Sequence, residues 1–197
     1  MNKTKICYLD LETGGLDREK SAVLQIGGII EINGKIKEHF DINCHPFEDD
    51  TINQEALDVN GLTLDEIKTF GSPKQGHLDL LKIFDRYIDK YNKADKFYMC
   101  GFNIDGFDRP MLRNFFIKNG DTYFGSYFYR QTLDIQNLYP LFLLKSLYKM
   151  DSHKLIDISR AFDIKFKESK LHEACYDAKL CRRILKKMNK RKIKLFK

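Results

Sequence analysis

Two carboxylates lie two residues apart near the start of the chain, at the end of an apolar run. In the stretch ICYLDLETGGLD (6–17), Asp10 and Glu12 follow four apolar or aromatic residues and precede Gly14 and Gly15. In a strand, residues i and i+2 lie on the same face, so the two acids would stand side by side. Two like charges at the rim of a core are costly unless a cation lies between them. The pair therefore indicates a divalent metal site, and the alternative is two surface acids on a frayed strand end.

A metal at this position needs further acids from other parts of the chain. Asp108 is one candidate, because it follows the apolar run FYMCGF (97–102) in the stretch CGFNIDGFDRPML. Residues at the carboxyl end of a strand, or at the start of the next helix, point into the crevice where α/β proteins bind ligands. Asp105 competes for the same role, since both acids lie close to Gly106.

Asp177 is the second candidate, in the stretch LHEACYDAKL, and His172 precedes it by five residues. Five helical steps turn through about 500°, which would leave the two side chains about 140° apart on a helix. They can converge only if His172 lies on the loop before the regular helix. The alternative for His172 is a residue at the start of the helix without a chemical role.

The candidate ligands also indicate which metal would bind. Four carboxylates without soft ligands suit hard, oxygen-binding ions such as Mg²⁺ or Mn²⁺. Two such ions can activate a water molecule and stabilise the leaving oxygen of a phosphodiester. A histidine can take the proton of that water near neutral pH. The residue types thus suit metal-dependent hydrolysis.

The hydrophobic patterns predict the elements that must position these residues. Asn33-Gly34 between two apolar runs is a strong hairpin signal, so the flanking strands should be antiparallel. Three strands followed by alternating helices and strands are typical of a ribonuclease-H-like α/β fold, with a mixed five-stranded sheet flanked by helices. We expect strands at 5–10, 23–32, 35–43 and 97–102, helices at 78–91, 107–118 and 173–189, a helical turn within 46–63 and weaker elements over 130–165.

Taken in order, three motifs resemble those of the DEDD 3'→5' exonucleases, which include polymerase proofreading exonucleases, oligoribonuclease and ribonuclease T. The motifs are Asp-x-Glu at 10–12, Asn-x-x-x-Phe-Asp at 103–108 and His-x-x-x-x-Asp at 172–177. The histidine marks the DEDDh branch, since the tyrosine of the other branch would stand at Glu173. Segments 52–63, 132–140 and 154–164 also resemble family segments, so the resemblance covers nearly the whole chain.

The resemblance implies an enzyme that removes nucleoside 5'-monophosphates from the 3' end of single-stranded DNA by a two-metal mechanism. Asp10, Glu12 and Asp177 would hold the first Mg²⁺ or Mn²⁺ ion, and Asp10 would bridge to the second. Asp108 would support the second ion, and His172 would be the general base. The substrate-binding residues implied by the resemblance are Thr13, Gly14, Gly15, Leu16, Asn60, Asn103 and Phe107.

Four of these residues, Thr13 to Leu16, form the turn after the first motif, which would contact the terminal nucleotide. The glycines would let the substrate approach the backbone closely. By resemblance, Thr13 would meet the terminal sugar and Leu16 its base. The chain departs from the family at Phe102 and Asn60, where histidine is frequent, and this leaves the substrate preference open. The alternatives are an exoribonuclease that acts on RNA or short oligonucleotides, and a module that binds nucleic acid or a polymerase without cutting.

Composition bounds the class of protein. The chain has 197 residues, of which 43% are apolar and 31% charged, as expected for a single soluble domain. The longest apolar stretch (138–148) is interrupted by Lys145 and is too short to cross a bilayer, and no secretory segment is expected at the N-terminus. Five cysteines without close pairs indicate free thiols in a reducing compartment such as the cytoplasm. A formal charge of +6 permits a polyanionic partner.

Two further segments have open interpretations. The aromatic cluster Tyr123, Phe124, Tyr127, Phe128 and Tyr129 would pack in the core or stack on bases. The basic C-terminal tail (about 186–197) would be a solvated helix end, a phosphate-binding segment or a docking peptide. The third hypothesis rests on KIKLF (192–196), which keeps the apolar spacing of peptides that bind bacterial sliding clamps. A sliding clamp or a DNA polymerase is therefore a candidate partner, and a membrane is not.

Overall fold

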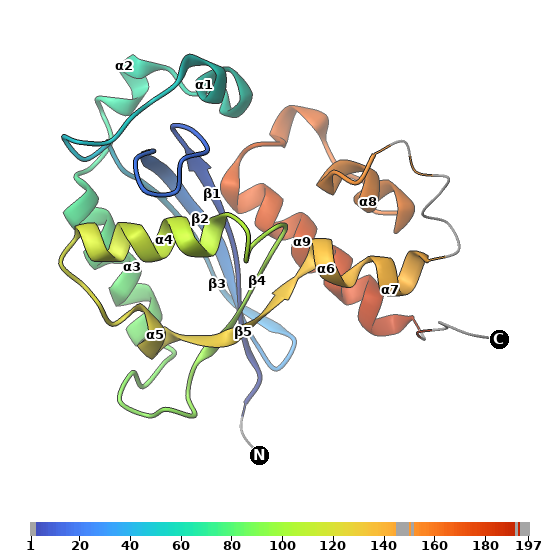
Figure 1. The fold of residues 1–197 in the computed structure, drawn as a ribbon. Coiled ribbons are helices and arrows are strands. Elements are labelled where there is room, and N and C mark those ends of the chain that lie inside the picture. Colours follow the sequence, from blue (N-terminus) through green and yellow to red (C-terminus); the bar gives the residue numbers. More distant parts are fainter. Residues whose placement is uncertain (1–2, 145–149, 151, 192, 194–197) are drawn as a thin grey trace.

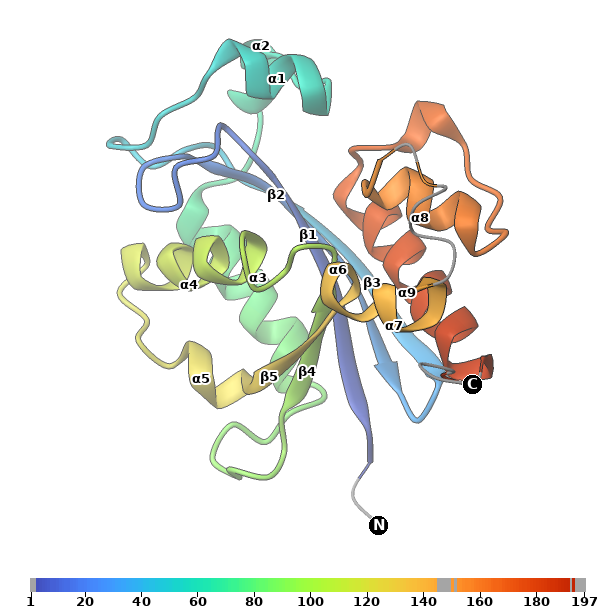
Figure 2. The same ribbon diagram turned by 45° about the vertical axis from the view of Figure 1, so that its right-hand side comes forward.

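A mixed five-stranded sheet forms the centre of the molecule, and helices cover both of its faces (Figures 1 and 2). The computed structural model describes residues 3–144, 150, 152–191 and 193. The strands are β1 (Lys5–Thr13), β2 (Val23–Ile32), β3 (Lys35–Asn43), β4 (Phe97–Gly101) and β5 (Phe128–Asp134), in the spatial order β3-β2-β1-β4-β5. The strand β2 is antiparallel to its neighbours β1 and β3, and β4 and β5 run parallel to β1. The predicted fold class is confirmed.

The hairpin between β2 and β3 forms where the sequence predicts it. Asn33 has a φ of 49° and Gly34 a φ of 77°. Two consecutive residues with positive φ match the twist of the flanking strands, and Asn-Gly accommodates that conformation at low cost. The hairpin therefore fixes the register of β2 against β3, with Gly28 opposite Phe40.

The first strand is longer than predicted. It continues past the expected end at residue 10 to Thr13, because β2 pairs with it as far as Val23 after a register shift between Glu12 and Thr13. Asp10 and Glu12 therefore lie within the strand and not beyond it. A paired backbone holds these two carboxylates more firmly than a frayed end would.

Alternation along β1 assigns its residues to two separate cores. Cys7, Leu9 and Leu11 pack in the core under α3 and α4, on one face of the sheet. Tyr8 packs with residues of α8 and α9 on the other face. Because side chains alternate between the faces, Asp10 and Glu12 both lie on the α9 face of the sheet, as expected of a pair at i and i+2.

The helices are short except for α3, α4 and α9. They are α1 (Gln54–Asn60), α2 (Leu64–Ile67), α3 (Pro73–Asp85), α4 (Asp108–Lys118), α5 (Phe124–Tyr127), α6 (Ile135–Leu138), α7 (Pro140–Leu143), α8 (Leu155–Ala161), a 3₁₀ turn at Glu168–Lys170, and α9 (Ala174–Lys190). The predicted helix at 107–118 and the predicted last helix are confirmed within one residue at each end. The helix α1 lies within 46–63, where a helical turn is predicted.

The prediction of a helix at 78–91 is wrong at both ends. The helix α3 begins at Pro73, because the Ser72 hydroxyl accepts a hydrogen bond from the Gln75 N–H and proline fits the first helical position. It ends at Asp85, so Tyr91 lies beyond it and is 87% exposed. Ser72 and Pro73, and not the apolar spacing, set the first of these bounds.

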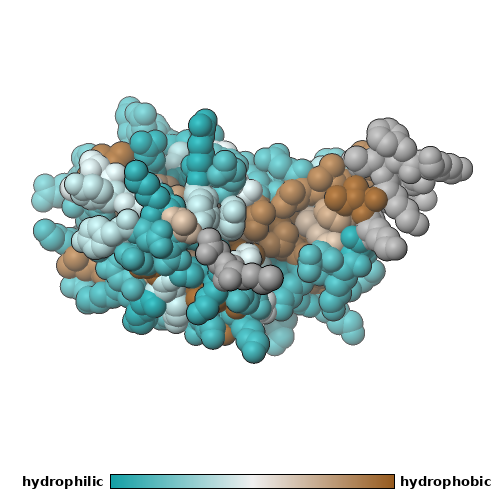
Figure 3. Space-filling model, turned by 90° about the horizontal axis from the view of Figure 1, so that it is seen from below, coloured by the Kyte–Doolittle hydropathy of each residue, from teal (hydrophilic) through white to brown (hydrophobic). Residues whose placement is uncertain are grey.

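A groove marks the end of the sheet where β1 begins. Seen from below, apolar side chains gather beside the C-terminal part of α9 (Figure 3), where a groove of about 610 Å³ is lined by Ile6, Leu133, Leu138 and Leu185, among others. Asp10 and Glu12 lie toward the other end of β1. The groove is thus separate from the candidate site. None of the described helices is long and apolar enough to cross a membrane.

Candidate active site

The sheet register places the start of α9 directly over the two acids of β1. Asp10 pairs with Gly27 of β2, and Glu12 pairs with Gln25. A Cβ atom on Gly27 would lie 2.1 Å from the backbone nitrogen of Cys175. Real Cβ atoms do not come so close to backbone, so glycine is required for α9 to contact β2 at this position.

Gln25 connects the same helix to the sheet. Its Oε1 accepts a hydrogen bond of 3.0 Å from the N–H of Ala174, the first residue of α9. Its Nε2 donates to Asn43 Oδ1 on the neighbouring strand. The first helical N–H groups lack partners within a helix, so Gln25 satisfies one of them and fixes the start of α9 beside Glu12.

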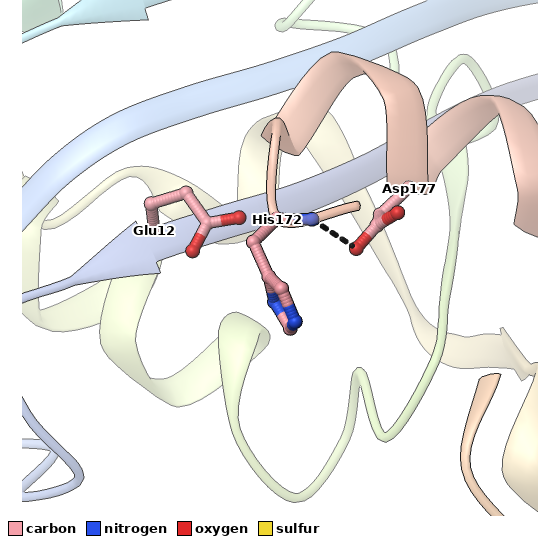
Figure 4. Close-up of side chains that lie close together, drawn as sticks. All are labelled: Glu12, His172 and Asp177. Carbon is pink, nitrogen blue, oxygen red and sulfur yellow. Dashed lines mark hydrogen bonds between the residues drawn. The ribbon is translucent and has the colours of Figure 1, made fainter. Parts of the chain in front are cut away.

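His172 and Asp177 converge through the loop that precedes α9. His172 lies two residues before the helix with a φ of 65°, and its N–H donates to Asp177 Oδ2 at 3.3 Å. The side chains of Glu12, His172 and Asp177 approach one another from β1 and from the start of α9 (Figure 4), and each offers a ligand atom within 4.8 Å of the others. The condition that His172 must precede the regular helix is met.

Asp108 reaches the acids of β1 from the other side. It is the first residue of α4, is 4% exposed, and its Oδ1 accepts a hydrogen bond of 3.0 Å from the Leu11 N–H, between the two acids. Asp105 points elsewhere, because its carboxylate binds Arg109 and the Thr132 hydroxyl. The structure therefore brings Asp108, and not Asp105, to the acids of β1.

Asp134 supports the loop that carries Asp108. Its buried carboxylate accepts hydrogen bonds from the backbone N–H groups of Asn103, Asp105 and Gln136. Asn103 has a φ of 55°, a conformation that asparagine adopts more readily than most residues. The loop 102–107 is thus held by a residue of β5.

A cavity of about 450 Å³ adjoins Glu12, and residues of α1 line one of its sides. Besides Glu12, it brings together five of the seven residues expected to bind substrate: Thr13, Gly15, Leu16, Asn60 and Phe107. Asn60 Nδ2 donates to the Thr13 carbonyl at 3.2 Å, which ties α1 to the end of β1. Leu16 is 83% exposed, as is suitable for contact with a ligand.

Gly14 and Asn103 do not line this cavity. A Cβ atom on Gly14 would lie 2.7 Å from the Thr51 carbonyl oxygen, and one on Gly15 would lie 2.8 Å from Ser21 Oγ. Both glycines therefore allow close packing of the chain on itself, whereas the sequence suggested close approach of a substrate. Only Gly15 of the two also faces the cavity.

Burial raises the pKa of all four carboxylates, and repulsion by the other acids adds to it at Asp10 and Glu12. Burial, followed by repulsion from Asp108, Asp177 and Glu12, raises the pKa of Asp10 well above its usual range. Burial and then repulsion from Asp177 and Asp108 raise the pKa of Glu12 to about 9. Burial also raises the pKa of Asp108 to about 8 and that of Asp177 to about 6. Each acid thus resists ionisation without a compensating cation.

These side chains fit a divalent cation. Among the described residues, Asp177 Oδ1 is buried without a hydrogen-bond partner, which is unfavourable unless another group binds it. The donor set consists of carboxylates and one imidazole and contains no thiolate. Oxygen donors of this kind suit Mg²⁺ and Mn²⁺.

A comparison of the sequence with models of protein families gives a match. The model of the RNase_T family, whose description is Exonuclease, matches residues 7–185. The chain belongs to this family. The resemblance to the DEDD 3'→5' exonucleases that the three motifs carry is confirmed. A comparison with curated protein sequences gives no match.

Solved structures of exonuclease I share the fold. A complex of the E. coli enzyme with single-stranded DNA, in a zinc-bound form, aligns with a TM-score of 0.77 and 18% identity over 97% of this chain and 41% of the other. A product-bound exonuclease I aligns with a TM-score of 0.73 and 17% identity over 96% and 44%. A complex of SSB and exonuclease I with an inhibitor aligns with a TM-score of 0.74 and 16% identity over 97% and 42%. This exonuclease chain thus spans well under half the length of those proteins.

The structure adds two residues that hold the site of this exonuclease together and that the motifs do not reveal. Gln25 fixes the start of α9 and Asp134 fixes the loop before α4. The signal for Gln25 is its position opposite Glu12, which depends on the register of β1 against β2 and not on any local pattern. Asp134 lies in a segment that resembles the family, but only its three hydrogen bonds show what it supports.

Proposed function

We propose that this exonuclease removes nucleoside 5'-monophosphates from the 3' end of single-stranded DNA with two divalent ions. The observation that carries the proposal is the convergence of Asp10, Glu12, Asp108 and Asp177 with His172, from β1, α4 and the start of α9. The choice of single-stranded DNA is supported by the structural likeness to exonuclease I, which has been seen in complex with single-stranded DNA.

Each acid of the site has a proposed role in holding the metals. Asp10, Glu12 and Asp177 would hold the first ion, Asp10 would bridge to the second, and Asp108 would support the second. When bound, Mg²⁺ or Mn²⁺ would supply activation of the attacking water and stabilisation of the leaving 3'-oxygen. The orphaned Asp177 Oδ1 and the raised pKa values of the carboxylates support this assignment.

His172 would take the proton of the attacking water. Its side chain is exposed and lies next to Glu12 and Asp177, so solvent reaches it beside the proposed metal ligands. The hydrogen bond from its N–H to Asp177 Oδ2 fixes its backbone and couples its position to that of the carboxylate. General bases of this type contribute about 10²–10⁴-fold to a rate.

The cavity beside Glu12 would hold the 3'-terminal nucleotide. Leu16 and Phe107 offer apolar contact to a base, and Thr13 and Asn60 lie at the same wall. The Thr13 hydroxyl already donates to the Gly15 carbonyl, so its remaining lone pairs can only accept. A donor such as the terminal 3'-hydroxyl suits that position.

Shortening of end-labelled strands tests the proposal. The wild-type chain should shorten a single strand of DNA from its 3' end with Mg²⁺ and leave it intact with EDTA, and Asp177→Asn should be inactive under both conditions. A matched RNA strand in the same assay decides the substrate class, since faster loss of RNA would favour an exoribonuclease. Binding without metal-dependent shortening would instead favour a module that does not cut.

The remaining proposals concern context. We propose one exonuclease domain over 1–197, since both cores lie on one sheet. The five cysteines are free thiols, which suits the reducing cytoplasm. Apart from Ile193, the KIKLF segment (192–196) lies outside the described residues, as does most of the tail beyond Arg191.

Three hypotheses remain for the basic C-terminal tail: a solvated helix end, a phosphate-binding segment or a docking peptide. Deletion of residues 190–197 distinguishes among them. Removal of a phosphate-binding segment would raise KM and flatten the salt dependence of strand binding. Removal of a docking peptide would abolish only capture by a sliding clamp. Removal of a solvated helix end would change neither measurement.

A further inference from the structure

Two cavities follow α4 away from the catalytic acids. The first, of about 450 Å³, lies beside Arg109 and Arg113 of α4 and is closed by Thr122 and Gly125. The second, of about 870 Å³, begins at Gly120, just after α4. The segment after α4 turns back beneath the helix toward α5 (Figure 1), so the same stretch of chain lines both cavities.

The first cavity lies beside the first turns of α4, the helix that begins with Asp108. Arg109 follows Asp108 directly and lines the first cavity. The helix α4 contains 11 residues and is therefore roughly 16 Å long at 1.5 Å per residue. At roughly 3.4 Å per nucleotide of a stacked strand, that length corresponds to about five nucleotides. The second cavity thus lies within reach of a strand whose 3' end is at the acids.

The two cavities are lined mainly by basic charge. Five Lys and Arg side chains and two Asp side chains contribute to their walls: Lys90, Lys93, Lys96, Arg109 and Arg113, against Asp105 and Asp121. Neither Lys93 nor Arg113 forms an ion pair with any other residue that the structure describes. These two cations are available to a negatively charged ligand.

Two exposed aromatic rings stand at the second cavity. Tyr123 is 72% exposed and Tyr91 is 87% exposed, although the backbone of each is fixed by a carboxylate. The Tyr123 N–H donates to Asp121 Oδ1 at 2.7 Å, and the Tyr91 N–H donates to Asp89 Oδ1 at 3.1 Å. The aromatic cluster predicted from the sequence therefore divides. Its members Phe124, Tyr127 and Phe128 are buried in the core, whereas Tyr123 offers its ring to solvent.

We propose that these cavities bind the part of a single-stranded nucleic acid that lies 5' to the nucleotide being removed. Bases would stack on Tyr123 and Tyr91, and phosphates would lie near Arg113 and Lys93. Aromatic platforms combined with basic side chains bind single strands without sequence preference, because every base has a π-face. The inference rests on the proposed function, since it takes the catalytic acids as the position of the 3' end.

The test compares a strand that reaches the cavities with one that does not. A dT20 strand spans both cavities, whereas a dT3 strand extends about 10 Å at most along α4 and does not reach Tyr91 and Tyr123 of the second cavity. We expect Tyr91→Ala/Tyr123→Ala to raise the KM for dT20 at least about 25-fold and to leave kcat/KM for dT3 unchanged, since stacking on each of the two rings alters affinity by about 5–150-fold. Lys93→Ala/Arg113→Ala should weaken dT20 binding and lower its salt slope by about 0.7 for each phosphate that the variant no longer neutralises.

Lys74→Ala is the matched control, because Lys74 is exposed on α3 and lines neither cavity. The Kd for dT20 is also measured in EDTA, so that binding is tested even if the wild-type chain fails to cut. Failure to cut would overturn the proposed function alone. Wild-type Kd values for dT20 in both double variants, or an equal loss on dT3 and dT20, would overturn the inference.

Discussion

At the scale of single residues, burial raises the pKa of every carboxylate of the site, and the other acids raise that of Asp10 further. Asp10 lies closest to the centre of this group, since repulsion from Asp108, Asp177 and Glu12 all raises its pKa. The four acids could be proposed from the sequence, because each belongs to a motif whose residues are a few positions apart in the chain. It could not show that Asp177 keeps one oxygen without a partner, because that depends on packing.

We predict that Asp10→Asn abolishes cleavage without unfolding the protein. The substitution removes a proposed metal ligand, so activity should fall by more than about a hundredfold. It also removes one of four mutually repelling acids, so the melting temperature in EDTA should hold or rise. Asp105→Asn is the control and should lose far less, because Asp105 binds Arg109 and Thr132 instead. An active Asp10→Asn enzyme would contradict the assignment.

The stability of the metal-free protein should fall as pH rises. The pKa of Glu12 is raised to about 9 and that of Asp108 to about 8, mainly by burial. Between the ordinary carboxyl pKa of about 4 and these values, the folded protein holds protons that the unfolded chain has lost. Unfolding then releases protons, so stability is lost from about pH 4 to about pH 9. Melting temperatures in EDTA at pH 5, 7 and 9 should fall more for the wild type than for Asp10→Asn, and equal slopes would refute the coupling.

His172 should control the pH dependence of the rate. Imidazoles lose their proton near neutral pH, so a histidine base gives a rate that rises on a limb in that range. His172→Asn suits the positive φ of 65° and should keep the loop in place. We expect it to lose about 10²–10⁴ in kcat together with the neutral limb. A variant with an unchanged pH profile would show that the proton goes elsewhere.

At the scale of elements, the contact between α9 and β2 decides whether the acids meet. Local patterns predicted the two elements closely, since an Asn-Gly turn bounds β2 and an apolar face defines α9. Their contact was not predictable, because Gly27 and Gln25 become significant only when residues 25–27 meet residues 174–175. The strand β5 was also missed as a separate element, since Phe128–Asp134 carries exposed Arg130 and Gln131 and no clear alternation.

Gln25→Ala should disturb catalysis from outside the group of acids. It leaves the Ala174 N–H without its acceptor, and loss of a helix cap costs about 0.5–2 kcal/mol. We expect kcat to fall about 10–100-fold, as for residues that orient metal ligands, with a smaller change in KM. Asn43→Ala is the control, because it removes only the hydrogen bond at the other end of the Gln25 side chain. Equal kcat values for the two variants would show that Gln25 does not position α9.

At the scale of the whole molecule, the acids of the site come together from elements on both faces of the sheet. The helix α4 brings Asp108 from one face and α9 brings Asp177 from the other (Figures 1 and 2). A metal bound among them therefore connects both cores. The mixed sheet could be predicted from the sequence, because the order of strands and helices along the chain indicates the topology. The cavities along α4 could not be predicted, because the side chains that line them follow no periodic pattern.

Metal binding should therefore stabilise the entire fold. A ligand at about 100 times its Kd adds about 2.7 kcal/mol to the free energy of unfolding. For a chain of this size that corresponds to a rise in melting temperature of about 5–10 °C. The rise should occur with Mg²⁺ or Mn²⁺ in the wild type and be absent in Asp10→Asn. A rise of the same size in both proteins would place the ion elsewhere.

The separation of the site residues along the chain also has a consequence for synthesis. Asp10, Glu12 and Asp108 leave the ribosome early, but Asp177 follows Glu12 by 165 residues. At about 5–20 residues per second, roughly 8–33 s pass between the first acids and the last. Throughout that time the nascent chain lacks α9, and the surface of Gly27 that α9 later covers stays open. The proposed activity can arise only after α9 has been synthesised, so a nascent chain that has not yet reached Asp177 cannot cut nearby nucleic acid.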